Sequence, residues 1–311
     1  MDTRSSILVV GSINMDLVLR TPRVPLAGES FVGRDYSNIP GGKGANQAVA
    51  AALLGAKVDF AGKTGTDSNG VKLKEQLEKF GIGTEHFIMD EHSQTGLAAI
   101  LLEDNGQNRI IVFLGANMQI RREDVQKALE KDYDAVIVQF EIPKEIVIDT
   151  CRTARKKNIP VIVDAGPAQD FPLEEIRGID ILSPNETETL AMCGIEPDSI
   201  KKASEAAKIL KQRSDARYIV IKMGKKGAML YSDEVTGLFP APEVEAVDTT
   251  AAGDAFTAAM TVEYIKNGDI ARAIRFANIV GAITVTRLGA QPSLPSLAEV
   301  EEFAKRRNIK W

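Results

Sequence analysis

The stretch Asp248-Thr-Thr-Ala-Ala-Gly-Asp254, followed by the apolar run AFTAAMTVEYI, predicts a helix with a carboxylate in its first turn. Three small residues without β-branches, Ala251, Ala252 and Gly253, separate the two aspartates. The first N–H groups of a helix have no partner within it and lie at the positive end of its dipole, so this position suits an anion. A carboxylate at this position repels phosphate, but it can deprotonate a nucleophile that attacks the phosphate. The alternative is an ordinary helix start, where Asp is favoured.

Around this stretch, short apolar runs alternate with helical patterns. Strands are expected over 135–140, 161–164, 179–182 and 218–223, and helices near 122–130, 144–157, 200–213, 252–266, 270–287 and 297–307. Such alternation is typical of an α/β fold with a doubly wound, mostly parallel sheet flanked by helices. No linker, low-complexity segment or internal repeat interrupts the pattern. We therefore expect one domain over residues 1–311.

Two extended segments near the N-terminus depart from this alternation. Residues 16–40 are punctuated by proline and glycine, and within 95–113 Asn105-Gly106 separates two β-rich runs, which is a hairpin signal. We expect these segments to pair into a small β-sheet lid inserted into the domain. Such a lid could cover a site or form a dimer interface, and the sequence does not choose between them.

Polar side chains follow the predicted strands where each one ends. Asn14 and Asp16 follow SILVVGSI, Glu141 follows VIVQF, Asp164 follows VIV, Asn185 and Glu188 follow ILSP, and Lys222 closes YIVI. The carboxyl ends of parallel strands share one edge of a sheet, where ligands bind, so we expect a single cleft. Asn185 and Glu188, three residues apart, could instead be a helix-capping pair, or could orient a hydrated Mg²⁺.

Two glycine-rich segments, 41–44 and 224–227, let the backbone approach a ligand closely. Lys43 and Asn46 add donors at the helix start that follows the first segment. In the second segment we expect the backbone N–H groups to meet phosphate, whereas the side chains of Lys225 and Lys226 suit a solvated turn. Neither segment is a Walker A loop, and no G-x-G-x-x-G follows a strand, so both of those nucleotide-binding classes are excluded.

Composition narrows the function further. A net charge of −5 with no long basic run argues against a nucleic-acid or membrane partner. Cys151 and Cys193 lack the spacing of a zinc site, and His86 and His92 are expected at the surface, so zinc and Ser/His/Asp chemistry are disfavoured. No apolar run reaches the length of a signal or spanning segment, and we expect a cytoplasmic protein.

Seven motifs, read together, point to a known family. They are GSINMD (11–16), GGKGANQA (41–48), FEIP (140–143), PNETE (184–188), KMGKKGA (222–228), VDTTAAGDAF (247–256) and TRLGAQPS (286–293). The motifs extend over nearly the full length of the chain, and their residues and their order resemble those of the ribokinase-like family of carbohydrate kinases. The resemblance implies ATP-dependent transfer of a phosphoryl group to the 5-hydroxyl of D-ribose, giving ribose 5-phosphate and ADP.

The same resemblance implies roles for residues at matching positions. Asp254 would be the catalytic base, and Ala251, Ala252 and Gly253 would form the anion hole. The sugar hydroxyls would be held by Asn14, Asp16, Gly42, Lys43, Asn46, Glu141 and Asp254. ATP would be held by Asn185, Lys222, Gly224, Lys225, Lys226, Gly227, Gly253 and Asn278, the last standing where some relatives have His.

The resemblance also implies ions and an assembly. Glu188 would support Mg²⁺ indirectly. A monovalent cation, usually K⁺, would bind beside the anion hole at Asp248, Thr250, Thr284, Arg287, Gly289 and Ser293, several of them through backbone carbonyls. A homodimer joined through the lid is expected. The alternatives are a kinase for deoxyribose, fructose, adenosine or another such substrate, and a non-catalytic sugar sensor, against which the intact Asp254 argues.

Overall fold

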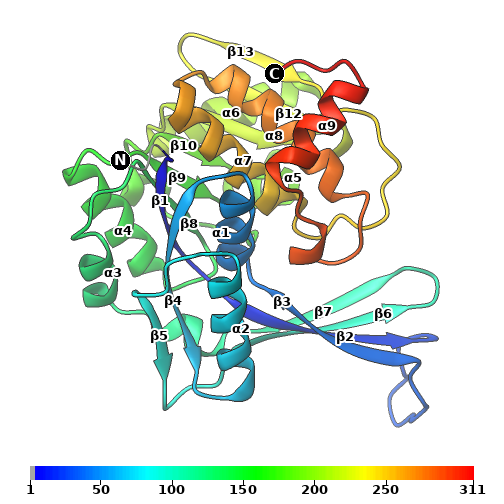
Figure 1. Ribbon diagram of the computed structural model, residues 1–311. Helices are drawn as coiled ribbons and strands as arrows, with labels where there is room; N and C mark the ends of the chain where they lie inside the picture. Colours follow the sequence, from blue (N-terminus) through cyan, green and yellow to red (C-terminus); the bar gives the residue numbers. More distant parts are fainter. Residues whose placement is uncertain (1–3) are drawn as a thin grey trace.

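The computed structural model describes residues 4–311, whose strands form two separate sheets (Figure 1). The large sheet has the order β13-β12-β11-β10-β9-β8-β1-β4-β5. Its strands are β1 (Ser6–Val10), β4 (Lys57–Gly65), β5 (Phe87–Asp90), β8 (Ala135–Gln139), β9 (Val161–Asp164), β10 (Ile181–Ser183), β11 (Tyr218–Lys222), β12 (Ala228–Tyr231) and β13 (Thr236–Phe239). From β11 to β5 all neighbours are parallel, while β12 and β13 are antiparallel. The predicted α/β fold class is confirmed.

Both faces of the large sheet are buried, which explains the continuous apolar runs of its strands. In β1, Ile7 and Val9 belong to one hydrophobic core, and Leu8 and Val10 belong to the other. Successive side chains of a strand point to opposite faces, so an unbroken apolar strand supplies two cores at once.

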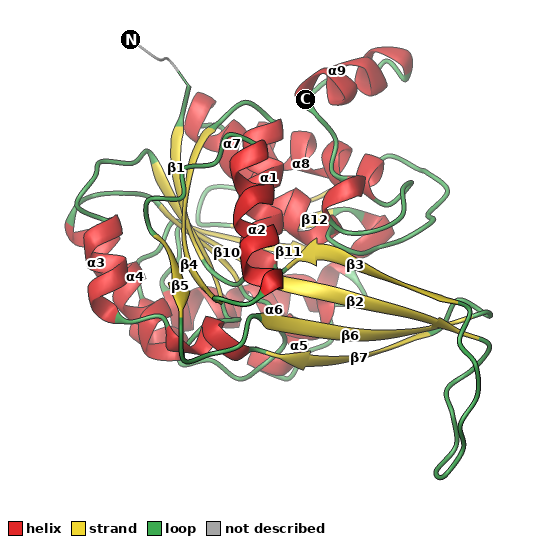
Figure 2. Cartoon of the chain, turned by 60° about the horizontal axis from the view of Figure 1, so that its bottom comes forward, coloured by secondary structure: helices red, strands yellow, loops and turns green. Residues whose placement is uncertain are grey.

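Helices cover each face of the sheet (Figures 1 and 2). The first core includes residues of α1 (Lys43–Leu53), α2 (Ser68–Lys79), α7 (Ala252–Asn267), α8 (Ile270–Thr284) and α9 (Leu297–Arg306). The second includes residues of α3 (Arg122–Ala128), α4 (Lys144–Lys156), α5 (Glu186–Cys193) and α6 (Ile200–Ser214). Short 3₁₀ turns, η1 (Gly115–Gln119), η2 (Leu173–Ile176), η3 (Gly224–Lys226) and η4 (Gln291–Ser293), lie between them.

Helix α7 carries the aspartate-rich stretch at its N-terminus and packs against both α1 and α8. Its residues from Asp254 to Tyr264 are all buried, so the helix is covered on every side. A helix buried on all sides belongs to the core. The chemistry expected at its N-terminus is therefore anchored on a core helix.

The four remaining strands form the small sheet, which projects from the body (Figure 2). Its strands are β2 (Asn14–Thr21), β3 (Asp35–Gly41), β6 (Gly96–Glu103) and β7 (Asn108–Phe113), in the order β3-β2-β6-β7. Asn105-Gly106 lies in the turn between β6 and β7, and Gly106 adopts a φ of 83°. Hairpin turns of this kind need positive φ, as the Asn-Gly signal predicts.

Several sequence expectations need correction. Asn14 and Asp16 do not trail β1, which ends at Val10; they belong to β2 of the small sheet, because the chain leaves the large sheet at Gly11. Strands β5, β12 and β13 were not expected: each has only four residues and most of β13 is half-exposed, so the apolar signal is weak. His86, expected at the surface, is buried.

Candidate active site

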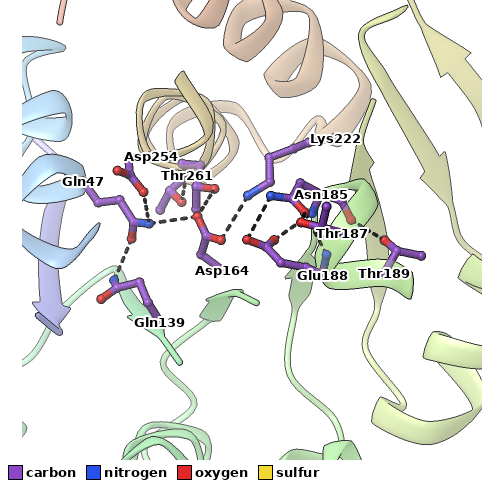
Figure 3. A network of polar contacts seen from close by, with 11 residues as sticks. Gln47, Gln139, Asp164, Asn185, Thr187, Glu188, Thr189, Lys222, Asp254 and Thr261 are labelled. Atoms are coloured by element: carbon purple, nitrogen blue, oxygen red, sulfur yellow. Dashed lines mark hydrogen bonds and ion pairs between the residues drawn. The ribbon is translucent and has the colours of Figure 1, made fainter. Parts of the chain in front are cut away.

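The polar strand ends meet the N-terminus of α7 in one buried network (Figure 3). Lys222 Nζ, at the end of β11, lies 3.0 Å from Asp164 Oδ1, at the end of β9. Asp164 Oδ2 accepts hydrogen bonds of 2.9 Å from Thr257 Oγ1 of α7 and from Gln47 Nε2 of α1. The same Gln47 amide donates to Asp254 Oδ1 over 3.3 Å. The large sheet and the helical layer that contains α1 and α7 are thus joined around two aspartates.

Asp254 is 5% exposed and lies in the first turn of α7. Its Oδ2 accepts a 2.9 Å hydrogen bond from Asn46 Nδ2. Burial raises the pKa of Asp254 to about 6, against the opposing attraction of the Lys43 ammonium. A carboxylate with a pKa in this range is ionised at neutral pH yet basic enough to accept a proton during a reaction.

The anion site predicted at residues 251–254 has the required helix start. Ala251 is the N-cap of α7 in the left-handed region, with a φ of 59°, and the Ala252 N–H makes a 3.3 Å bond to Thr249 O. A Cβ atom on Gly253 would lie 3.7 Å from Lys222 Nζ, so the space before the helix faces an ammonium group. Helix N–H groups and a lysine therefore converge beside Asp254.

The glycine-rich start of α1 is in close contact with the backbone where β1 has ended. Gly42 has a φ of 90°, and a Cβ there would lie 2.7 Å from Ile13 Cα, so both conformation and space require glycine. The Lys43 N–H donates over 3.4 Å to Glu141 Oε2, which also accepts a hydrogen bond from Ser12 Oγ. A carboxylate at a helix N-terminus is stabilised by the dipole.

The side chain of Lys43 lies among carboxylates. Burial alone would lower its pKa, but the charges of Asp254, Asp164, Glu188 and Glu141 outweigh burial and raise the pKa of Lys43 above its usual value. Burial likewise opposes ionisation of Asp164, but Lys222 and Lys43 hold its pKa below the ordinary range. Lys43 therefore stays charged and offsets part of the negative charge of the cleft.

Asn14 is oriented by a residue that the sequence analysis did not single out. Asn117, fully buried in η1, donates its Nδ2 group to Asn14 Oδ1 over 2.7 Å and to Leu114 O over 2.9 Å. Its Oδ1 accepts from the Ile13 N–H over 2.9 Å. Because the oxygen of Asn14 is engaged, its NH₂ group is the one presented to a ligand.

Asp16 lies near the other carboxylates at the base of the small sheet. Burial, followed by repulsion from Glu141 and Asp254, raises its pKa to about 7. Its carboxylate packs against Gly41 of β3, where a Cβ would collide with it. A carboxylate so destabilised in the absence of ligand gains when hydroxyl groups donate hydrogen bonds to it.

A cavity of about 880 Å³ lies on the other side of the α7 N-terminus. All eight residues predicted for the nucleotide line it: Asn185, Lys222, Gly224, Lys225, Lys226, Gly227, Gly253 and Asn278. Asn278 Nδ2 donates to Phe239 O over 2.9 Å, so its amide is fixed by the last residue of β13. The volume is in the range of small-molecule and cofactor sites.

Asn185 and Glu188 form the capping pair that the sequence left as one alternative. Asn185 Oδ1 accepts from the Glu188 N–H over 2.9 Å, and Glu188 Oε2 accepts from the Asn185 N–H over 2.7 Å. Burial raises the pKa of Glu188, against the opposing attraction of the charges of Lys222 and Lys43. Capping thus places a buried carboxylate next to Asn185, which lines the cavity.

The segment containing Asp248 contacts the loop after α8. Asp248 Oδ1 accepts from Thr250 Oγ1 over 2.6 Å, and its Oδ2 accepts from the Gly289 N–H over 2.9 Å. Burial opposes ionisation, but these hydrogen bonds hold the pKa of Asp248 below its usual value. Of the remaining residues predicted for the cation, Thr284 ends α8, Ser293 lies in η4, and Arg287 pairs with Glu299 through its side chain.

Two features are absent from residues 4–311. No group of three or more His, Cys, Asp or Glu side chains is placed to hold a metal ion within that range. Nor does the same range contain a helix long and apolar enough to cross a bilayer.

Two functional candidates in this network lay beyond the roles assigned from sequence. Asp164 was noted only as a polar strand end, and Gln47 only as a letter of the GGKGANQA motif. A polar residue that the pattern places on the buried face of a helix is a signal that could have drawn attention to Gln47, since such groups need partners. Its partners lie 92 to 207 residues away, so the sequence could not name them.

A buried carboxylate beside an open helix start, between a cavity and a second polar cluster, is the arrangement expected of a small-molecule phosphotransferase. The comparisons with known proteins identify which kind. The model of the pfkB family of carbohydrate kinases matches residues 4–297, and the chain belongs to this family.

Individual relatives span nearly the whole chain. It is 38% identical over 300 residues to the ribokinase of Bacillus subtilis, covering 96% of this chain and 99% of that protein. It is 33% identical to the deoxyribokinase of Salmonella typhimurium, covering 96% and 98%. The structure of Arabidopsis thaliana ribokinase complexed with ribose and ATP superimposes with a TM-score of 0.90 at 32% identity, covering 97% of this chain and 99% of that one.

Proposed function

We propose that this protein phosphorylates D-ribose at its 5-hydroxyl with ATP, giving ribose 5-phosphate and ADP. The observation that carries the proposal is the position of Asp254, buried between the 880 Å³ cavity and the Asn14–Asp16 end of the cleft. Relatives named ribokinase, one of them in complex with ribose and ATP, support the choice of both substrates.

In the proposed reaction, Asp254 accepts the proton of the sugar's 5-hydroxyl as its oxygen attacks the terminal phosphorus of ATP. The bond from that phosphorus to the bridging oxygen breaks, and ADP leaves. Phosphoryl transfer asks the protein mainly for positioning and stabilisation of charge. The N–H groups at Ala251, Ala252 and Gly253, together with the Lys222 ammonium, would receive the transferring group.

The sugar would bind at the base of the small sheet. Asn14 offers its NH₂ group to a hydroxyl oxygen, and Asp16 accepts hydrogen bonds from hydroxyl protons. Gly42, Lys43, Asn46 and Glu141 line the start of α1 beside them. A site that leaves such groups unpaired with an analogue lacking a hydroxyl discriminates strongly against it. This supports ribose over 2-deoxyribose.

Mg²⁺ fits the cleft, which holds five carboxylates against two lysines: Asp16, Glu141, Asp164, Glu188 and Asp254 against Lys43 and Lys222. The phosphates of ATP add further negative charge, which a divalent cation offsets. Mg²⁺ prefers phosphate oxygens and water, so a single protein carboxylate, Glu188, is enough to orient its hydration shell. The ion would neutralise charge on the transferring phosphates.

A monovalent cation fits the contact between the Asp248 segment and the 284–293 loop. Asp248 is held ionised by Thr250 and Gly289, and backbone carbonyls of the surrounding turns are the ligands that K⁺ takes in proteins. The predicted set is Asp248, Thr250, Thr284, Arg287, Gly289 and Ser293. The ion would stabilise the turn that leads into the anion hole.

We further propose that the small sheet is both a lid over the sugar and the interface of a homodimer. Ile110, Ile111, Val112 and Phe113 of β7 are between 45% and 56% exposed, and β7 is an edge strand. An apolar edge strand left open is a template for association, so a second copy would cover it.

A cytoplasmic location is consistent with ATP as substrate and with two cysteines that are both unpaired.

The test is release of ADP on adding ribose, 2-deoxyribose, fructose or adenosine with ATP and Mg²⁺. The highest kcat/KM is expected for ribose. A clear preference for 2-deoxyribose would indicate a deoxyribokinase, the activity for which the Salmonella relative is named. No turnover with any acceptor, but tight binding of one sugar, would instead indicate a sensor.

A further inference from the structure

Two glutamine side chains, Gln47 of α1 and Gln139 of β8, are fully buried and face each other under the catalytic aspartate (Figure 3). Gln139 Nε2 donates to Gln47 Oε1 over 2.6 Å. Gln47 Nε2 in turn donates to Asp164 Oδ2 over 2.9 Å and to Asp254 Oδ1 over 3.3 Å. The roles proposed for substrate contacts use neither glutamine.

The direction of these hydrogen bonds is dictated by charge. An ionised carboxylate only accepts, so the group of Gln47 that faces Asp254 and Asp164 must be its NH₂. The oxygen of Gln47 must then face Gln139, which can only meet it with its own NH₂. Gln139 therefore sets the orientation of Gln47, and Gln47 sets the orientation of the carboxylates.

In this arrangement, the side-chain oxygen of Gln139 has no hydrogen-bond partner among the described residues. The Oε1 atom of Gln139 is buried and accepts no hydrogen bond from the residues that the structure describes, and it packs against Gly11 instead. An orphaned buried acceptor destabilises a folded protein, whereas an apolar residue at position 139 would leave none. A polar residue kept at that cost beside a reactive group points to a role in the reaction rather than in folding.

We propose that Gln139 and Gln47 form a positioning relay that holds the Asp254 carboxylate in the orientation in which it accepts the sugar's proton. Neither glutamine is a catalytic residue; Gln139 acts through Gln47, and Gln47 acts through Asp254. The inference rests on the proposed function, because it assigns the relay to the base of that reaction. Asn46 fixes one oxygen of Asp254 and the relay fixes the other.

The charged groups around Asp254 come from several elements, and the relay, like Asn46, is a neutral contact among them. Lys43 of α1, Asp164 of β9, Lys222 of β11 and Asp16 of β2 all interact with the Asp254 charge. Replacing a neutral glutamine leaves these charges in place. A change in the pH dependence of turnover then reports the lost hydrogen bond and not a lost charge.

The experiment uses Gln139→Met and Gln47→Met in the full-length protein, with kcat and KM for ribose measured between pH 5 and 9. Turnover is expressed per ribose-binding site counted by calorimetry, so partial unfolding does not imitate the effect. We expect Gln139→Met to lower kcat about 10-fold and Gln47→Met about 100-fold, in line with the cost of misplacing a catalytic group. Both KM values should stay within about twofold of the wild type.

The acid limb of the kcat profile should also move to higher pH in Gln47→Met. Removing a hydrogen bond to the charged form of Asp254 raises its pKa, so the base is lost at a higher pH than in the wild type. The matched control is Thr261→Val, which removes a 2.8 Å bond from Thr261 Oγ1 to Thr257 O one turn along α7 and touches neither aspartate. Its kcat and pH profile should remain those of the wild type.

The outcomes separate the relay from the proposed function. If the wild type turns over and Asp254→Asn does not, yet both glutamine variants keep wild-type kcat and acid limb, the relay is overturned and the kinase stands. If Thr261→Val loses as much activity as Gln139→Met, the loss reflects general packing and the relay is again overturned. If the wild type phosphorylates no acceptor, the proposed function itself fails.

Discussion

The network around Asp254 and the small sheet differ in how completely their groups are covered. Asp254 and Asp164 are almost fully buried, and each oxygen of both accepts at least one bond from a neighbouring element. In the small sheet, the apolar residues 110–113 of β7 stand half-exposed at an edge. Fixed dipoles and charges are what stabilise a transition state, whereas entry and release of a sugar require parts that move. This difference supports the proposal that the first region performs the chemistry and the second controls access.

The largest expected effect breaks the chemistry while leaving access intact. Asp254→Asn keeps the shape of the side chain but removes the base, so kcat should fall by about 10²–10⁴-fold. Binding of ribose and ATP, measured by calorimetry, should stay within a few-fold of the wild type. Near wild-type turnover in this variant would mean that another group takes the proton.

The next prediction tests how much a buried ion pair of the network contributes to the free energy of unfolding. Lys222→Met leaves Asp164 buried without its 3.0 Å partner, and breaking such a pair costs about 3–5 kcal/mol of unfolding free energy. Urea unfolding at pH 7 measures the loss. The control Lys202→Met removes an exposed pair with Asp198, for which less than about 1 kcal/mol is expected. Equal losses in the two variants would contradict the contrast between buried and exposed regions.

A pH series sharpens the same contrast within the cleft. Asp254 must be ionised to act, and its pKa is raised to about 6, so kcat should fall about tenfold for each pH unit well below 6. Asp16, with a pKa raised to about 7, should lose affinity for the sugar first, so KM for ribose should rise below pH 7. A KM that is flat from pH 8 to 5 would remove Asp16 from sugar binding.

A smaller effect on turnover is expected when the small sheet is changed. Ile110 and Ile111 point to opposite faces of β7, so Ile110→Glu and Ile111→Glu place a charge on different sides. If one face joins two copies, one variant should sediment as a monomer and the other as a dimer. For either variant, kcat should change less than about 10-fold, far less than for Asp254→Asn. Two dimeric variants would place the interface elsewhere.

The smallest expected effect concerns the cation. Replacing Na⁺ by K⁺ at constant ionic strength should raise kcat a few-fold, because the proposed ion would support the turn leading into α7. Asp248→Asn should abolish the difference between the two salts. Equal rates in Na⁺ and K⁺ would remove the cation site but leave the kinase intact.

The sequence predicts the large sheet well because its strands are buried on both faces. Leu8, Val9 and Val10 belong to one uninterrupted apolar run, and that run can only be satisfied between two helical layers. Strands β12 and β13 escape prediction because they are four residues long and β13 is largely half-exposed. β12 pairs with β11 and β13 pairs with β12, so each is positioned by the strand beside it and not by its own pattern.

The site residues likewise include some that the sequence predicts and some that it does not. Residues at strand ends and in glycine-rich turns, such as Asp164 and Gly42, carry local signals that point to a cleft. The contacts of Gln47, Gln139 and Asn117 join positions about 90 to 210 residues apart, and no local pattern encodes them. Physical reasoning from sequence therefore finds the reactive groups more readily than the groups that orient them.

The start of β2 has a practical consequence. Asn14 and Asp16 lie among the first three residues of a strand that continues to Thr21 in the projecting sheet. A sugar bound to both side chains would therefore also restrict the movement of that strand. The only tryptophan of the chain, Trp311, packs on Phe276 beside α8, away from that sheet. A tryptophan introduced at exposed Tyr36, opposite Leu19 of β2, would thus give an optical signal of sugar occupancy. The protein could serve as the scaffold of a fluorescent sensor whose reading needs neither turnover nor a coupled enzyme.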